Sequence, residues 1–304
     1  MNIRLLCILA FIFSSYAGAQ QCTTSVLVNA FDARTKTTLH GLRASDFAAS
    51  IGRDATTVDS VRPVFRNRVL VLLDVSRYKN DSSRNALLQS TVDDLEESPA
   101  GMPVMFGAFA ERAVFTANFS SDPESLAAAV KLTVPRASSL GGKSNLTNAL
   151  HQALKKFGQH RPGDTILLVS NGDGRLGRSL ARDFARSGAR LQLLMNAPDT
   201  SDGHSFSLFA AFAAADQINP NLIKLANSTG GVLMGFMNSE WYDAAASGYL
   251  LEVRESQSRK PQSWRLQVRN YDDEFGVESV LFYPLQLPAC SVPLIASTRP
   301  HGES

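Results

Sequence analysis

Residues 69 to 76 read Val-Leu-Val-Leu-Leu-Asp-Val-Ser. The unbroken apolar run predicts a strand that is covered on both faces, as the strands of a parallel sheet are. The run ends at Asp74 and Ser76, and their spacing of two places both side chains on the same side of an extended chain. Ligands of open α/β sheets bind beyond the carboxyl ends of the strands. We therefore expect a ligand site at Asp74 and Ser76.

Apolar strands alternate with helical stretches over a long central block. We expect strands at 68–75, 104–110, 113–119, 165–170, 191–196 and 232–235. Between them, the apolar periodicity predicts helices at 82–95, 123–132, 144–157, 177–186 and within 206–227. This alternation predicts an α/β fold, a doubly wound and mostly parallel sheet with helices on both faces.

Short alternating segments flank this block at both ends. They cover 25–31, 41–47 and 55–61 before it, and 249–254, 263–269 and 279–283 after it. Alternation of this kind is typical of half-buried strands, so we expect the two flanks to pair into a small sheet of their own. The predicted organisation is a β-rich flank at 20–66, the α/β domain at 67–240, a second β-rich flank at 241–290 and a tail at 291–304.

The first nineteen residues have the pattern of a signal peptide. Arg4 precedes an apolar stretch from Leu5 to Phe13, and a small-x-small pattern ends at Ala19. A membrane anchor is the competing interpretation, but the apolar stretch is short for a span. Cys22 does not directly follow the small residues, which argues against lipid attachment. We expect an exported protein, periplasmic or secreted, with no transmembrane segment in the mature chain.

Cysteine use and charge restrict the class of protein further. Removal of the signal peptide would take away Cys7 and leave Cys22 and Cys290 as the cysteines of the mature chain. A disulfide between these two is compatible with an oxidising compartment. Sequence spacing does not establish proximity, so the bridge stays open at this point. The formal net charge is +2, and the basic residues are scattered. We therefore expect neither nucleic acid nor an anionic membrane as the partner.

Three features in chain order resemble a von Willebrand factor type A domain. They are the strand ending in Asp74-x-Ser76, the Gly141-Gly142 turn that enters a helix, and the later apolar strand that ends in a short polar loop. The flanking segments 26–32, 41–47 and 248–253 resemble the secreted VWFA-related proteins best known from acidobacteria. The resemblance extends over essentially the whole mature chain.

This resemblance implies a metal-ion-dependent adhesion site, in which three loops offer oxygen ligands to a divalent cation, usually Mg²⁺. Asp74 and Ser76 match the first loop, but its third position is Tyr78, whose phenolic oxygen lies too far out to replace a serine hydroxyl. Ser144 stands for the threonine of the second loop, and Asn171 stands where the family has aspartate.

The Asn171 departure removes one of two negative charges, so the resemblance implies a degenerate site. Asp173 either restores that charge or is a turn residue, and Asn-Gly-Asp-Gly is ordinary turn chemistry. Asp74 itself either binds a cation or caps the amides of its own loop.

A rival motif overlaps the second loop. Residues 137–144, Ala-Ser-Ser-Leu-Gly-Gly-Lys-Ser, fit a relaxed phosphate-binding loop, in which Lys143 would meet phosphates and Ser144 would hold magnesium. The first glycine is replaced by Ala137, and Lys131-Leu-Thr-Val-Pro before it is a poor strand.

Other catalytic patterns are weaker. The five histidines lack metal-ligand spacing, and His151 is expected to pack or face water. Ser76 and Ser170 lack a recognisable base.

We therefore expect an exported, non-catalytic, adhesion-type module that binds another protein through its loop face. The loop residues are Asp74, Ser76, Tyr78, Ser144, Asn171 and Asp173. A structural or assembly role is the alternative, in which an edge of the flanking β segments accepts a strand from a partner. A nucleotide hydrolase is a distant third.

Overall fold

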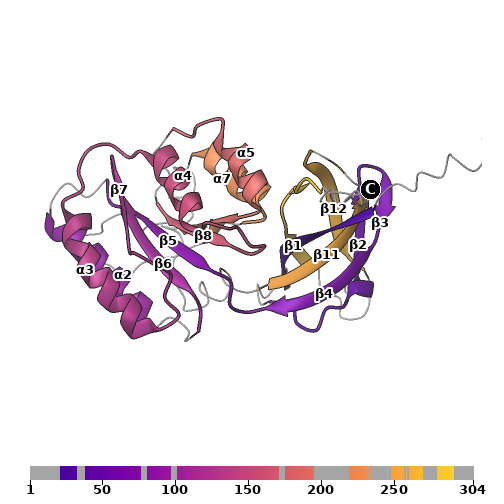
Figure 1. Ribbon diagram of the computed structural model, residues 1–304, viewed down its shortest axis with the longest axis horizontal. Helices are drawn as coiled ribbons and strands as arrows, with labels where there is room; N and C mark the ends of the chain where they lie inside the picture. Colours follow the sequence, from indigo (N-terminus) through magenta and orange to yellow (C-terminus); the bar gives the residue numbers. More distant parts are fainter. Residues whose placement is uncertain are drawn as a thin grey trace, which may run out of the picture.

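A computed structural model describes residues 21–32, 38–76, 81–96, 101–170, 175–194, 219–231, 233–234, 245, 248–256, 258, 260–269 and 279–290. Figure 1 shows two units: an α/β unit built on a six-stranded sheet, and a β unit made from both ends of the chain. The expected signal peptide at 1–19, the tail at 291–304 and residues 206–218 of the last expected helix lie outside the described residues.

The sheet of the α/β unit has the strand order β10-β9-β8-β5-β6-β7. Its strands are β5 (Val69–Asp74), β6 (Val104–Phe109), β7 (Ala113–Phe115), β8 (Thr165–Val169), β9 (Arg190–Leu194) and β10 (Leu233–Met234). All described pairings are parallel except that of β6 with β7. Parallel neighbours need crossover connections, which explains the predicted alternation of strands and helices. The predicted fold class is confirmed.

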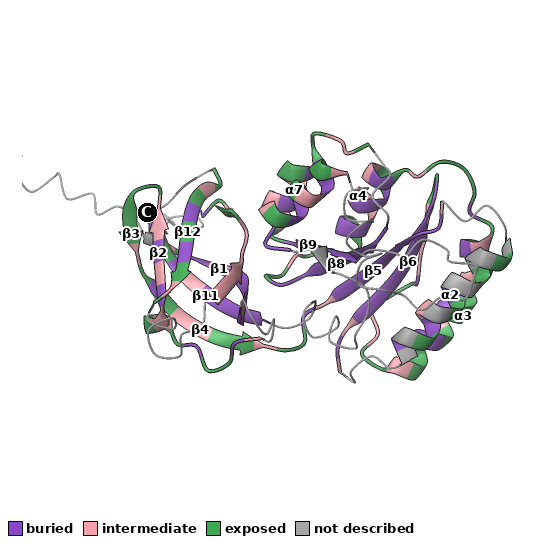
Figure 2. Ribbon diagram, turned by 180° about the vertical axis from the view of Figure 1, so that it is seen from behind, coloured by how far each residue is buried: buried purple, intermediate pink, exposed green. Residues whose placement is uncertain are grey.

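Helices cover both faces of this sheet (Figure 1). They are α2 (Asp81–Glu96), α3 (Pro123–Ser138), α4 (Leu146–Lys156), α5 (Leu180–Ser187) and α7 (Pro220–Ser228). Val69, Val71 and Leu73 of β5 pack in one core with α2 and α3, whereas Leu70 and Leu72 pack in the other core with α4, α5 and α7. Successive side chains of a strand point to opposite faces, so an unbroken apolar strand supplies both cores. Figure 2 shows β5, β6 and β8 buried along their length.

The β unit contains two four-stranded sheets, β13-β1-β11-β4 and β14-β12-β2-β3. Their strands are β1 (Gln21–Asp32), β2 (Phe47–Ile51), β3 (Asp54–Thr56), β4 (Val58–Val64), β11 (Gly248–Ser256), β12 (Gln262–Val268), β13 (Ser279–Phe282) and β14 (Gln286–Leu287). The two chain ends pair with each other as predicted, but they form two sheets where we expected one. Val28, Leu251 and Trp264 belong to one buried cluster that both sheets share.

The strand predicted at 41–47 is wrong. Residues Ala44–Asp46 form a short 3₁₀ helix, and β2 begins only at Phe47. The carboxylate of Asp46 accepts a hydrogen bond from the Arg43 amide at 2.7 Å, which closes a turn. Short acidic side chains favour such local bonds to the backbone over a sheet ladder.

Helix α3 is longer than the predicted 123–132 because it continues through Pro135 to Ser138. The hydroxyl of Thr133 donates to the Ala129 carbonyl at 2.9 Å within this part of the helix. Val130 and Ala137 are fully buried in the core on this side of the sheet. Burial therefore outweighs the cost of a proline inside the helix.

Two features connect distant parts of the chain. Cys22 and Cys290 form a disulfide, which settles the pairing that the sequence left open. The guanidinium of Arg190 donates to Asn29 of β1 and to Thr165 of β8, and so connects the β unit with the central sheet. Burial lowers the pKa of Arg190 to about 9.

Candidate binding site at the carboxyl edge of the sheet

Asp74 is the last residue of β5, which lies in the middle of the sheet between β6 and β8. Its side chain is buried although it is polar, since only 7% of the residue is exposed. A buried carboxylate is costly unless hydrogen bonds replace the lost water. The partners of this carboxylate therefore define the site.

Three donors from three separate loops converge on Asp74. The Ser76 amide, in the loop after β5, donates to Oδ1 at 3.0 Å. The Ser144 hydroxyl, in the loop before α4, donates to Oδ2 at 3.1 Å. The Ser170 hydroxyl, directly after β8, donates to the same Oδ2 at 2.9 Å. One carboxylate thus holds together loops that are far apart in the sequence.

The loop that carries Ser144 is itself anchored to the end of β6. The Asn145 amide donates to the Ala110 carbonyl at 2.8 Å, and the Glu111 amide donates to the Gly141 carbonyl at 3.3 Å. Gly142 has a φ of +88°, and a Cβ at this position would lie 2.7 Å from Oε2 of Glu111. The left-handed backbone therefore favours glycine here, and the exposed Glu111 side chain would have to shift to admit a Cβ.

The loop after β8 is held in two places. The Ser170 amide donates to the Leu194 carbonyl of β9 at 3.2 Å. Further along, the Thr147 hydroxyl of α4 donates to the Arg175 carbonyl at 2.6 Å and accepts from the Gly177 amide at 2.8 Å. Helix α4 thus orients the described part of the loop that leads into α5.

Sequence reasoning brought Asp74, Ser76 and Ser144 together correctly as neighbours, but it missed Ser170. In the sequence, Ser170 stands out only as a candidate nucleophile without a recognisable base. Its position immediately before Asn171, at the end of an apolar strand that neighbours β5, was the available signal. Tyr78, Asn171 and Asp173 lie outside the described residues, so their predicted roles stay predictions.

The separations of the described oxygens suit hydrogen bonds and would also suit neighbouring ligands of a magnesium ion. Ligands of Mg²⁺ at about 2.0–2.1 Å in octahedral geometry stand roughly 2.9 Å from their neighbours. Oδ2 of Asp74 lies 2.9 Å and 3.1 Å from the hydroxyls of Ser170 and Ser144, close to that spacing. Asp74 is the one carboxylate among these three side chains. The oxygen separations would therefore suit a divalent cation, but the single negative charge would compensate its charge only in part.

The rival phosphate-binding loop lacks the required geometry. Such a loop leaves a strand and enters a helix. Here Lys131 to Pro135 are part of helix α3, and Ala137, in place of the first glycine, is buried within the same helix. The motif at 137–144 is therefore a sequence coincidence.

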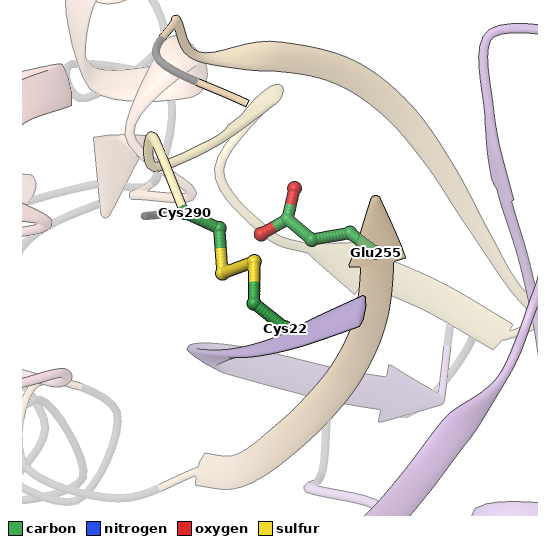
Figure 3. A group of neighbouring side chains, drawn as sticks. All are labelled: Cys22, Glu255 and Cys290. Carbon is green, nitrogen blue, oxygen red and sulfur yellow. A yellow bond between two sulfur atoms is a disulfide. The ribbon is translucent and has the colours of Figure 1, made fainter. Parts of the chain in front are cut away.

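A second polar cluster lies in the β unit, where Glu255 stands beside the disulfide between Cys22 and Cys290 (Figure 3). Both cysteine sulfurs are used in their mutual bond, so the group is not a metal centre as it stands. The Glu255 carboxylate accepts hydrogen bonds from Thr24 and, at 2.9 Å, from Gln262. Burial raises the pKa of the Glu255 carboxyl, and these hydrogen bonds offset part of that effect.

Among the described residues, no helix has both the length and the apolar character needed to cross a bilayer. No protein-family model and no curated protein matches the chain.

Several solved structures are similar in fold. An aerotolerance-related membrane protein from Bacteroides fragilis is 17% identical, with 59% of this chain and 96% of that chain covered and a TM-score of 0.40. The ArnB paralog VWA2 from Sulfolobus acidocaldarius is 13% identical, with 89% and 76% covered and a TM-score of 0.40. Proximal thread matrix protein 1 from the mussel byssus is 14% identical, with 64% and 50% covered and a TM-score of 0.42.

These matches are distant, and nothing about function is taken from them. The arrangement within this chain is von Willebrand type A-like: a doubly wound sheet, helices on both faces, and three loops that meet at Asp74.

Proposed function

We propose that this chain is an exported module that binds another protein through the rim around Asp74. The rim comprises Asp74, Ser76, the loop 141–145, Ser170 and the described residues 175–177. The observation that carries the proposal is the convergence of three loops on one buried carboxylate.

Anchored loops favour binding because less conformational freedom is lost when a partner docks. The rim loops are fixed to Asp74, to the end of β6 and to α4 by the hydrogen bonds described above. Loops on a rigid scaffold are the usual place for recognition residues. The rim therefore presents a defined surface before any partner arrives.

Exposed charged side chains on the loops around this site would supply the polar contacts. Glu111 and Arg112 follow β6, Lys143 lies in the loop before α4, and Arg175 lies in the loop fixed by Thr147. All four are exposed. Polar contacts of this kind determine which partner is accepted more than they determine total affinity.

A cation is not required for this function. Asp74, Ser144 and Ser170 would hold Mg²⁺ if it binds, and the ion would then offer a positive centre to an acidic group of the partner. With one carboxylate among these ligands, we expect weak affinity. Calorimetric titration with Mg²⁺ tests this part: heat that a chelator abolishes would show a bound cation, and identical signals with and without chelator would reject it.

Export is supported by the signal-peptide pattern at 1–19 and by the disulfide between Cys22 and Cys290. Disulfides persist mainly in oxidising compartments such as the periplasm or the extracellular space. The partner would accordingly be an envelope or extracellular protein.

Affinity capture with the full chain tests the proposed function. The immobilised protein is compared with Asp74→Ala and with Asp59→Ala, a control that removes an aspartate paired with Arg254 in the β unit. A rim partner should be retained from the envelope fraction by the native chain and by the control, and lost with Asp74→Ala. Equal retention by all three proteins would indicate that the partner binds outside the rim, for example at the flanking β segments.

A further inference from the structure

A serine, a histidine and an aspartate lie in a row on the surface formed by α4 and α5, with one hydrogen bond and one ion-pair contact between them. Oγ of Ser179 lies 3.2 Å from Nε2 of His151. Nδ1 of the same imidazole lies 3.3 Å from Oδ2 of Asp183. This order of atoms, hydroxyl to Nε2 and Nδ1 to carboxylate, is the order of a Ser-His-Asp catalytic triad.

Two helical pairs produce this arrangement. Ser179 and Asp183 are four residues apart at the start of α5, so both face the same side, and His151 lies on that side from α4. Thr147, one turn before His151, fixes the Arg175–Gly177 backbone through its hydroxyl. The sequence predicted that His151 would pack or face water, and the structure shows that it has two polar partners.

The partners of His151 determine which nitrogen carries its proton when the ring is neutral. A carboxylate accepts but does not donate, so the Asp183 carboxylate 3.3 Å from Nδ1 favours the tautomer with its proton on Nδ1. Nε2 is then left with its lone pair towards the Ser179 hydroxyl. The ring is thereby oriented as a general base for Ser179.

The surroundings of Ser179 suit a nucleophile. Ser179 is the N-cap residue of α5, yet its hydroxyl makes no capping hydrogen bond and is directed to His151 instead. Within the described chain, the first-turn amides of Ala181 and Arg182 make no backbone hydrogen bond outside the helix. Helix-start amides of this kind can stabilise developing negative charge by donating hydrogen bonds to it. Ser179 is exposed, and the side chains of His151 and Asp183 are 29% and 31% exposed, so a small substrate can reach them.

We propose that Ser179, His151 and Asp183 form an acyl-transfer site for small, unhindered carboxylic esters. Oγ of Ser179 attacks the ester carbonyl while Nε2 of His151 takes its proton. The bond to the alcohol breaks, and His151 returns the proton to the leaving alcohol, which gives an acyl-Ser179. Water then attacks the acyl group while His151 takes its proton, the bond between the acyl carbon and Oγ of Ser179 breaks, and His151 returns the proton to Oγ, which releases the carboxylic acid and restores the serine.

This activity is separate from protein binding at the rim. Neither Asp74 nor Ser144 takes part in it. Loss of one function should therefore leave the other intact, and the two proposals can fail independently.

The test is p-nitrophenyl acetate with the full chain. A burst of p-nitrophenolate equal to the protein concentration is expected, and mass spectrometry should locate one acetyl group on Ser179. Ser179→Ala should abolish the burst. His151→Gln keeps hydrogen-bonding capacity but cannot accept the proton, and it should slow acylation by about 100-fold or more. Asp183→Asn should also slow acylation.

Ser187→Ala is the matched control, since Ser187 lies at the other end of α5 and donates to the Phe184 carbonyl. It should behave as the native protein does, and circular dichroism should show that every variant is folded. Acetyl groups found only on lysine or histidine side chains would overturn the proposal. So would acetylation of Ser179 at the native rate in His151→Gln, or the absence of any burst.

Discussion

Removal of the two hydroxyls that hold Asp74 is the sharpest test of the site geometry. Ser144 and Ser170 both donate to Oδ2, at 3.1 Å and 2.9 Å, and the carboxylate is almost fully buried. Ser144→Ala and Ser170→Ala each delete one donor without adding bulk. The double variant leaves Oδ2 with neither hydroxyl.

The magnitude follows from the charge of the acceptor. A hydrogen bond to a charged group contributes about 1.5–3 kcal/mol. Each single variant keeps one hydroxyl on Oδ2, so we expect each to lower the free energy of unfolding by about 1–2 kcal/mol. The double variant should lose more than the sum by about 0.5 kcal/mol or more, because two donors share one oxygen.

Urea unfolding followed by circular dichroism measures these values. Ser45→Ala is the matched control, because its hydroxyl donates to the Asp46 carboxylate at 3.2 Å on an exposed surface. That variant should change stability by less than about 0.5 kcal/mol. Losses for Ser144→Ala and Ser170→Ala no larger than the control, with strict additivity in the double variant, would refute the shared-carboxylate geometry.

Three further predictions concern the rest of the chain. Replacing Cys22 and Cys290 with serine should lower the free energy of unfolding by about 2–5 kcal/mol, and a reducing agent should then have no further effect on the urea midpoint. Glu255 has a raised pKa in the folded state, so it holds a proton that the unfolded chain releases near its ordinary value of 4.5. The free energy of unfolding should therefore fall as the pH rises from this value through the raised pKa. The Glu255→Gln variant should show a flatter dependence of the urea midpoint on pH in this range. An unchanged slope in the variant would contradict the assignment. Gly142→Ala should cost about 1–2 kcal/mol because of its left-handed backbone and close neighbour, whereas Gly141→Ala, which has open space, should be nearly neutral in the same unfolding experiment.

Local patterns were sufficient for the α/β unit. The unbroken apolar run of β5 predicted burial on both faces, and the structure places its alternate residues in two separate cores. The rule for the carboxyl ends of parallel strands predicted a site at Asp74, and the resemblance to a von Willebrand type A domain added Ser144, which the structure places beside it. The first two predictions succeeded because they depend on period and chain order, both of which the sequence displays directly.

Long-range pairing and local capping were harder to predict. Two sheets form in the β unit because β2 pairs with β12, which lies more than two hundred residues away in the sequence. Local sequence patterns do not predict a pairing at this distance. Asp46 converts an expected strand into a 3₁₀ turn through one hydrogen bond to Arg43. Ser170 was missed because its importance depends on a partner from another strand, Asp74.

The pairing also restricts how the alternative binding surface can be tested. Truncation after about Tyr249 would remove most of β11, which lies between β1 and β4, together with the half-cystine Cys290. The β unit would lose its centre, so a truncated chain could not separate the two binding surfaces. Two of the edge strands are poor sites for strand addition, because β3 has three residues and β4 carries Pro63.

Hydrogen–deuterium exchange of the full chain with and without a captured partner tests the central claim most directly. We predict that the partner slows exchange in peptides covering 74–76, 141–145 and 170–177, while β3, β4 and β13 exchange as before. Slower exchange confined to those edge strands, with the rim peptides unchanged, would contradict binding through the loops around Asp74.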